Sequence, residues 1–160
     1  MLVNLLRLPP AEPALEGLRA AGVLVRRARP WELTQVREFV GENFGRAWAD
    51  EVSVGLVRQP VTVFVALRGG RLVGFAAYEC SRKNFFGPAG VVEEERGRGL
   101  GRALLLASLR GLRELGYAYA VVGGVGPAEF YERAAGARLI PDSSPGIYAD
   151  PLGQGGDRSL

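Results

Sequence analysis

The sequence predicts a domain of the α/β (α+β) class, with a mixed, mostly antiparallel central sheet and flanking helices. Two segments rich in β-branched and aromatic residues flank Gly69-Gly70, a pattern typical of an antiparallel hairpin with a tight turn. Three further elements follow in order: a third strand over 85–92, a leucine-rich helix over 100–115 and a buried strand over 117–124. Because a strand–helix–strand unit normally places its two strands parallel through a right-handed crossover, we expect a mixed sheet.

The other elements follow from strand composition, helical spacing of apolar residues, and Gly or Pro at the ends. The predicted strands include 2–6, 23–30, the hairpin strands 61–68 and 71–80, and a closing pair over 137–140 and 146–150. The predicted helices include 12–22, 31–45, 47–59 and 127–136. We expect three parts: an N-terminal extension packed on the domain (1–22), the domain itself (23–150) and a flexible tail (151–160).

The composition excludes several classes of protein. Hydrophobic residues make up 48% of the 160 residues, which suffices for one domain with a core, and the formal net charge is +3. With no histidine and one cysteine, the chain has no Ser-His-Asp or Cys-His catalytic pair and no Cys/His zinc site, so we expect no metal. A single cysteine fits a reducing cytoplasm. No apolar run reaches the ~18 residues of a membrane helix, and scattered arginines without interleaved aromatics argue against nucleic acid.

The segment "RGRGLG", residues 96–101, places three glycines directly before the leucine-rich helix. A helix N-terminus presents unpaired N–H groups and a partial positive charge, and glycine leaves them accessible. With the arginines between and after the glycines, the segment suits a pyrophosphate; a plain glycine-rich turn is the alternative. No glycine precedes a Lys-Ser or Lys-Thr pair, and the glycine spacing differs from G-x-G-x-x-G, so neither a P-loop nor a dinucleotide-binding motif fits.

The same residues resemble the GNAT superfamily of acyl-coenzyme A-dependent N-acyltransferases. "RGRGLG" fits the family signature [Q/R]-x-x-G-x-[G/A], and "GVVEEE" before it is similar to the strand that leads into that loop. "EFYERAAGARLI" resembles the second motif, a helix with Phe-Tyr-Glu followed by a glycine and a strand. "VFVALRGGRLVGFAAYE" is similar to the family's second and third strands. The likeness covers roughly 23–150.

The resemblance implies a V-shaped opening between the fourth and the fifth strands of the family fold, with acetyl-CoA lying in it. The pantetheine would pair with the backbone beside a bulge at Gly87-Pro88, and the pyrophosphate would rest on the glycine loop. The implied cofactor-binding residues are Ala89, Gly90, Val91, Arg96, Gly97, Arg98, Gly99, Leu100, Gly101 and Arg102.

The chain departs from the family pattern at two positions. Many members carry an asparagine where this chain has Gly124, and a proline where it has Glu93. The first departure puts one contact to the cofactor in doubt. We expect the run from Glu93 to Glu95 to be a solvated approach to the loop.

The resemblance implies that Tyr131 protonates the departing thiolate; the alternative is a core aromatic beside Phe130. Because adjacent helix residues point about 100° apart, we expect one of the pair to pack inward and the other to face the cleft. An ammonium substrate must also lose a proton, and without histidine the choice of base falls on carboxylates. Glu79, at a strand end, is one candidate base, and we expect burial to raise its pKa into the range that suits this role. The alternative for Glu79 is a solvent-facing strand residue. Asp150 is the other candidate base. Cys80 is expected to be a small buried residue.

The predicted function is therefore a cytoplasmic N-acetyltransferase that transfers an acetyl group from acetyl-CoA to a primary amine by direct attack. The acceptor would be a small-molecule amine or a peptide N-terminus, in a pocket near Tyr78, Asn84, Phe85 and Phe86. Many relatives pair as homodimers, so a homodimer is compatible with the resemblance. The alternative is a non-catalytic acyl-CoA-binding regulatory or sensor domain.

Overall fold

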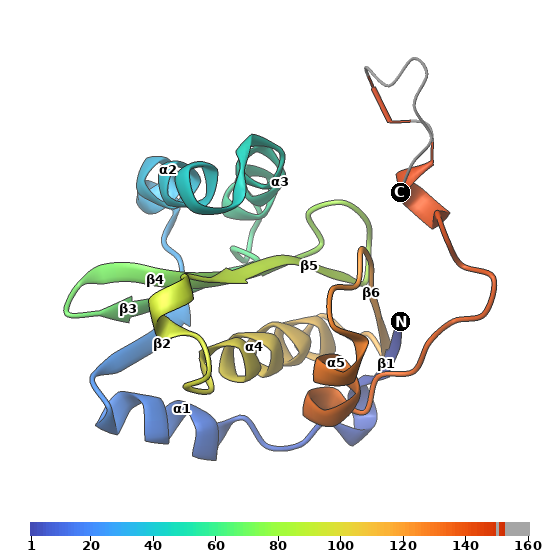
Figure 1. The fold of residues 1–160 in the computed structure, drawn as a ribbon, viewed down its shortest axis with the longest axis horizontal. Helices are drawn as coiled ribbons and strands as arrows, with labels where there is room; N and C mark the ends of the chain where they lie inside the picture. Colours follow the sequence, from blue (N-terminus) through green and yellow to red (C-terminus); the bar gives the residue numbers. More distant parts are fainter. Residues whose placement is uncertain (150, 153–160) are drawn as a thin grey trace.

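A computed structural model describes residues 1–149 and 151–152. This part of the chain forms a six-stranded sheet in the order β1-β6-β5-β4-β3-β2 (Figure 1). Five neighbouring pairs make up the sheet, and only β5 and β6 run parallel, so the predicted mixed, mostly antiparallel sheet is confirmed. The strands are β1 (Leu2–Asn4), β2 (Val23–Arg27), β3 (Val63–Arg68), β4 (Arg71–Tyr78), β5 (Phe85–Val91) and β6 (Tyr119–Val122).

Helices cover both faces of the sheet, as Figure 1 shows. Two of them, α2 and α3, lie on one face over a core that includes Val40, Val52 and Phe75. The other three lie on the opposite face, over a core built around Leu104, Leu105 and other leucines of α4. The helices are α1 (Glu12–Ala20), α2 (Leu33–Phe44), α3 (Arg46–Leu56), α4 (Leu100–Glu114) and α5 (Ala128–Ala135).

The hairpin and the crossover form as predicted. Gly69 and Gly70 have φ of +56° and +83°, the left-handed region that a two-residue turn between β3 and β4 requires and that glycine adopts without strain. Helix α4 connects β5 to the parallel strand β6. Its leucine face is buried because the helix lies against β3, β4 and β5.

Strands β5 and β6 part soon after they meet. Only two residue pairs join them, Phe85 with Val121 and Phe86 with Val122. On its other side β5 continues beside β4, with a register shift opposite Gly87-Pro88 where the bulge was expected. The edge of β5 that faces away from β4 is therefore open from the bulge to Val91. This is the V-shaped opening predicted between the family's fourth and fifth strands, which are β5 and β6 here because β1 precedes them.

The predicted closing strand pair is wrong. Arg138 makes one isolated bridge with Leu2, and the segment Gly146–Tyr148 is a 3-10 turn. The sheet position beside β6 is taken by β1, which comes from the other end of the chain. Residues 1–22 thus contribute a strand to the sheet, and the division at residue 22 stays a prediction. Asp150 and most of the predicted tail, residues 153–160, lie outside the described residues.

Candidate functional site

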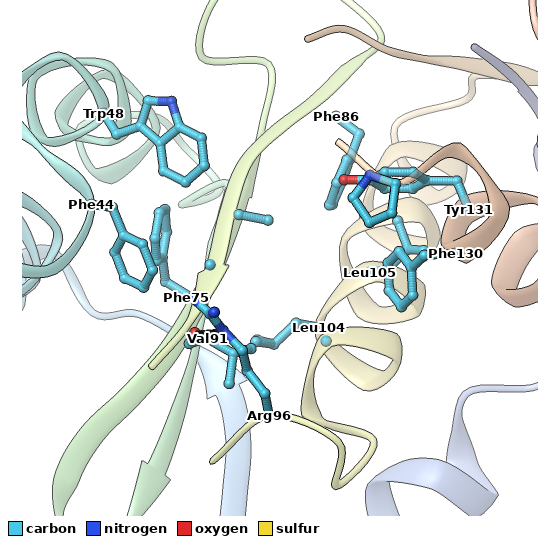
Figure 2. A pocket seen from close by; sticks show the side chains of 14 residues that line it. Phe44, Trp48, Phe75, Phe86, Val91, Arg96, Leu104, Leu105, Phe130 and Tyr131 are labelled. Carbon is cyan, nitrogen blue, oxygen red and sulfur yellow. Dashed lines mark hydrogen bonds between the residues drawn. The ribbon is translucent and has the colours of Figure 1, made fainter. Parts of the chain in front are cut away.

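The opening between β5 and β6 contains a cleft of about 320 Å³. Figure 2 shows that β5 runs through the middle of it, with aromatic residues of α2, α3 and β4 on one side and residues of α4 and α5 on the other. The lining residues are Phe44, Trp48, Phe75, Phe86, Ala89, Gly90, Val91, Arg96, Gly101, Leu104, Leu105, Pro127, Phe130 and Tyr131.

The three predicted β5 residues, Ala89, Gly90 and Val91, all line the cleft. They pair with β4 on one side, so their other edge faces the opening. A Cβ placed on Gly90 would lie 2.5 Å from Cε1 of Phe44, so the glycine allows the Phe44 ring to pack directly on the strand. The carbonyl of Val91 accepts a hydrogen bond from Nε of Arg96 at 3.0 Å.

The glycine loop leaves the N-terminus of α4 accessible. Gly97 and Gly99 have φ of +74° and +84°, both are exposed, and no other atom lies within 4 Å of a Cβ placed on either. The first α4 hydrogen bond runs from the N–H of Ala103 to the carbonyl of Gly99 at 3.1 Å. The N–H groups just before Ala103 therefore have no partner within the helix, which is the arrangement that binds anions.

The predicted loop residues have different surroundings. Arg96 and Gly101 line the cleft, and Phe130 lies 3.6 Å from a Cβ placed on Gly101. Arg102 is exposed, and Arg98 pairs with Glu95 at 3.3 Å. The side chain of Leu100 is buried in the core, so only its backbone is available to a ligand.

Glu95 is a site residue that the sequence analysis missed. Glu93 and Glu94 are exposed as expected, but Glu95 is 4% exposed. Its carboxylate accepts two hydrogen bonds from Arg68, at 2.6 and 2.9 Å, which hold the pKa of Glu95 below its usual value. Because Arg68 lies 27 residues earlier in the chain, no local pattern could have shown this contact. The pair fixes the start of the glycine loop to the end of β3.

Tyr131 lies where the resemblance places it, in the wall of the cleft. Its ring packs edge-on against Phe130, at 5.1 Å between centroids, and against Phe86, at 6.2 Å. Its hydroxyl points toward the opening in Figure 2. Burial raises the pKa of Tyr131 above its usual value, so the phenol stays protonated at neutral pH. Phe130 lines the cleft too, so the expectation that one of the two rings packs away from it is wrong.

Glu79 does not have the properties expected of a base. It is 3% exposed, lies outside the cleft lining, and pairs with Lys83 at 3.4 Å and Arg58 at 3.5 Å. The Asn84 N–H also donates to it at 3.2 Å. Burial raises the pKa of Glu79, but hydrogen bonds from Tyr117 and Asn84 and the charge of Lys83 together bring it below its usual value. The expected raised pKa is therefore wrong, and its surroundings are those of a structural ion pair.

Other expectations concern the acceptor side. Of the four residues expected there, only Phe86 lines the cleft, while Tyr78 is fully buried with its hydroxyl 2.5 Å from Nη1 of Arg27. Cys80 is buried as expected, and burial raises the pKa of its thiol to about 12. At Gly124, where many family members carry asparagine, the Tyr148 hydroxyl lies 3.5 Å from a Cβ placed on the glycine.

Comparison with known proteins gives the family. Residues 59–134 match the model of the acetyltransferase (GNAT) domain, a stretch that includes β5, the glycine loop and Tyr131. The chain carries a GNAT acetyltransferase domain. No functionally curated protein is similar enough to the chain to count as a match.

Solved structures share the GNAT fold. A glucosamine N-acetyltransferase region of a fungal multi-domain GH3 β-N-acetylglucosaminidase is 18% identical with a TM-score of 0.68, covering 84% of this chain and 19% of that chain. A GNAT family N-acetyltransferase from Escherichia coli in complex with CoA is 26% identical with a TM-score of 0.55, covering 70% and 67%. A GNAT family acetyltransferase from Brucella melitensis with acetyl-CoA is 21% identical with a TM-score of 0.54, covering 74% and 91%.

The described residues lack two features. No three of their His, Cys, Asp or Glu side chains are grouped so that they could hold a metal ion. In the same part of the chain, no helix is long and apolar enough to cross a membrane.

Proposed function

We propose that this GNAT domain transfers an acetyl group from acetyl-CoA to a primary amine. One observation carries the proposal: the open edge of β5 and the accessible N-terminus of α4 border the same cleft. An extended amide chain ending in a pyrophosphate needs both features at once, a strand edge to pair with and N–H groups to hold the phosphates. The CoA-bound and acetyl-CoA-bound structures of the same fold support this ligand.

In this proposal acetyl-CoA contacts the cofactor-binding residues that the family resemblance implies. The pyrophosphate accepts hydrogen bonds from the N–H groups of the loop between Gly97 and Arg102, and the exposed guanidinium groups beside it add positive charge. The pantetheine amides pair with the open edge of Ala89, Gly90 and Val91. Arg96 already donates to the carbonyl of Val91, and the second lone pair of that oxygen can still accept a pantetheine amide.

The reaction then needs three proton movements. The ammonium loses a proton, the neutral amine attacks the thioester carbonyl carbon, and a C–N bond forms. The C–S bond of the tetrahedral intermediate breaks, and the thiolate takes a proton from the Tyr131 hydroxyl. The nitrogen's remaining extra proton returns to Tyr131 through solvent, which leaves an amide, free CoA and one released proton. The free, buried Cys80 fits a reducing compartment, and we place the reaction in the cytoplasm.

A non-catalytic acyl-CoA sensor is the second candidate, because none of the described residues that line the cleft is a carboxylate. Incubation of the protein with acetyl-CoA and a mixture of primary amines separates the two. If the domain transfers acetyl groups, the mass spectrum will show free CoA together with an acetylated amine, and both will form at a rate proportional to the enzyme concentration. Tight binding of acetyl-CoA without either product would instead support the sensor.

A further inference from the structure

Glu51 on α3 is a partly buried carboxylate that the proposed reaction has not used. Burial raises the pKa of Glu51, and a hydrogen bond from Ser81 partly offsets this. Glu51 makes no ion pair with any cation of the described residues. Arg58 and Lys83, two of the cations near Ser81 and this end of α3, both pair with Glu79. A half-buried carboxylate without a cation is costly, so the position suits a cationic ligand.

Glu51 lies one helical turn beyond Trp48, which lines the cleft. Residues three apart on a helix are neighbours, with Cβ atoms about 5–6 Å apart. The Trp48 ring stacks on Phe44, at 5.9 Å between centroids, and lies edge-on to Phe75 at 6.3 Å. Trp48 is 38% exposed and Phe44 is partly buried, so these two rings present an open aromatic surface beside the carboxylate, while Phe75 is buried beneath them.

The segment that contains Tyr148 also places Glu51 close to the point where β5 and β6 separate. The Tyr148 hydroxyl lies 2.7 Å from a Cβ placed on Gly123, the residue directly after β6, and the Phe85 ring lies 3.3 Å from the same point. The charge of Glu51 contributes to the raised pKa of Tyr148, after burial, so the two side chains are within electrostatic reach of each other. The Sγ atom of Cys80 lies 2.9 Å from a Cβ placed on Gly55, which follows Glu51 by one turn of α3, so Ser81 and Glu51 lie at the same end of the sheet.

We propose that Glu51 binds the ammonium group of the acceptor and that the acceptor is a monocationic primary amine with an apolar or aromatic body lying on Trp48 and Phe44. This inference rests on the proposed acetyl transfer and names its substrate class. Glu51 also takes the proton that the ammonium loses before attack, and solvent carries it away. A polycationic acceptor such as an aminoglycoside fits poorly, because Glu51 is a single carboxylate beside the cleft and the cleft lining among the described residues holds none.

The test is steady-state kinetics at saturating acetyl-CoA with 2-phenylethylamine, glucosamine and sisomicin as acceptors. We expect the highest kcat/KM for 2-phenylethylamine. Glu51→Gln should lower that kcat/KM by about 10- to 100-fold, as expected for the loss of a charge-assisted contact. KM for the amine should rise while KM for acetyl-CoA and the Tm stay near wild type. Trp48→Leu should raise KM for 2-phenylethylamine more than for glucosamine.

The neighbouring Asp50→Asn is the matched control, because Asp50 is exposed and pairs with Arg37 at 3.0 Å. It should leave all these constants within about twofold of wild type. Amine kinetics of Glu51→Gln equal to wild type, or sisomicin as the best acceptor, would overturn this inference while acetyl transfer stands. A protein that binds acetyl-CoA in calorimetry but acetylates none of the three amines would overturn it as well. Absence of acetyl-CoA binding would overturn the proposed function with it.

Discussion

At the scale of single residues, Tyr131 is the side chain on which the proposed chemistry depends most. The phenol is half-buried between Phe86 and Phe130, and burial raises its pKa, so it holds a proton that it can donate. Glu79, the other catalytic candidate, has cation partners and a lowered pKa instead. Both residues were found from the sequence, but only the three-dimensional surroundings separate a donor in the cleft from a structural ion pair.

Tyr131→Phe should lower kcat by about 10²- to 10⁴-fold, the usual contribution of general acid catalysis. The ring and its packing are kept, so Tm and the Kd for acetyl-CoA should change little. Tyr119→Phe is the control, because Tyr119 is a half-exposed tyrosine on β6 outside the cleft lining. If chemistry is shown to limit turnover and Tyr131→Phe keeps kcat within about threefold, solvent protonates the thiolate and Tyr131 serves only in packing.

Glu95→Gln should lower Tm and weaken acetyl-CoA binding, because it removes the charge that holds Arg68 and Arg98 beside the glycine loop. The pKa of Glu95 is lowered in the folded state, so its stabilisation is present above the ordinary glutamate pKa of about 4.3 and is lost as pH falls through the lower folded value. The Tm difference between wild type and Glu95→Gln should therefore narrow at acid pH.

Glu94→Gln is the matched control for this prediction. Glu94 is exposed and its carboxylate lies 3.6 Å from Arg71, a surface pair of the kind worth about 0–1 kcal/mol. Thermal scans between neutral and acid pH would compare the two variants. Equal effects of Glu94→Gln and Glu95→Gln would show that the buried pair with Arg68 does not hold the loop.

At the scale of elements, the start of α4 depends on two glycines with positive φ. Gly99→Val should weaken acetyl-CoA binding by at least tenfold, because a branched side chain disfavours the left-handed backbone and stands over the unpaired N–H groups. Gly116→Val is the control: Gly116 follows the other end of α4, has φ of +97°, and a Cβ there also meets nothing within 4 Å. Calorimetry should show much weaker acetyl-CoA binding for Gly99→Val than for Gly116→Val. Equal losses of affinity in the two variants would show that backbone strain alone causes the effect.

The elements were largely predictable, and the exceptions have a common cause. Leucine spacing gave α4, and the paired glycines gave the β3–β4 turn, because both signals are local. The closing strand pair was wrong because β1, more than a hundred residues earlier, occupies the edge beside β6. The Arg68–Glu95 pair was missed for the same reason. Within the site, the motif gave the glycine loop, β5 and Tyr131, whereas the aromatic wall from α2 and α3 follows only from tertiary packing.

At the scale of the whole molecule, acetyl transfer requires that one cleft between β5 and β6 binds acetyl-CoA across several elements. A ligand that bridges β5, α4 and α5 stabilises the folded state, since the unfolded chain lacks the site.

The most direct test is thermal unfolding of the wild-type protein with and without acetyl-CoA at about 100 times the Kd measured by calorimetry. Binding at one site predicts a stabilisation of about 2.7 kcal/mol, or a rise in Tm of roughly 5–10 °C for a chain of this size. Gly116→Val should show the same rise and Gly99→Val a much smaller one. An unchanged wild-type Tm, together with no heat of binding in the calorimeter, would contradict the account.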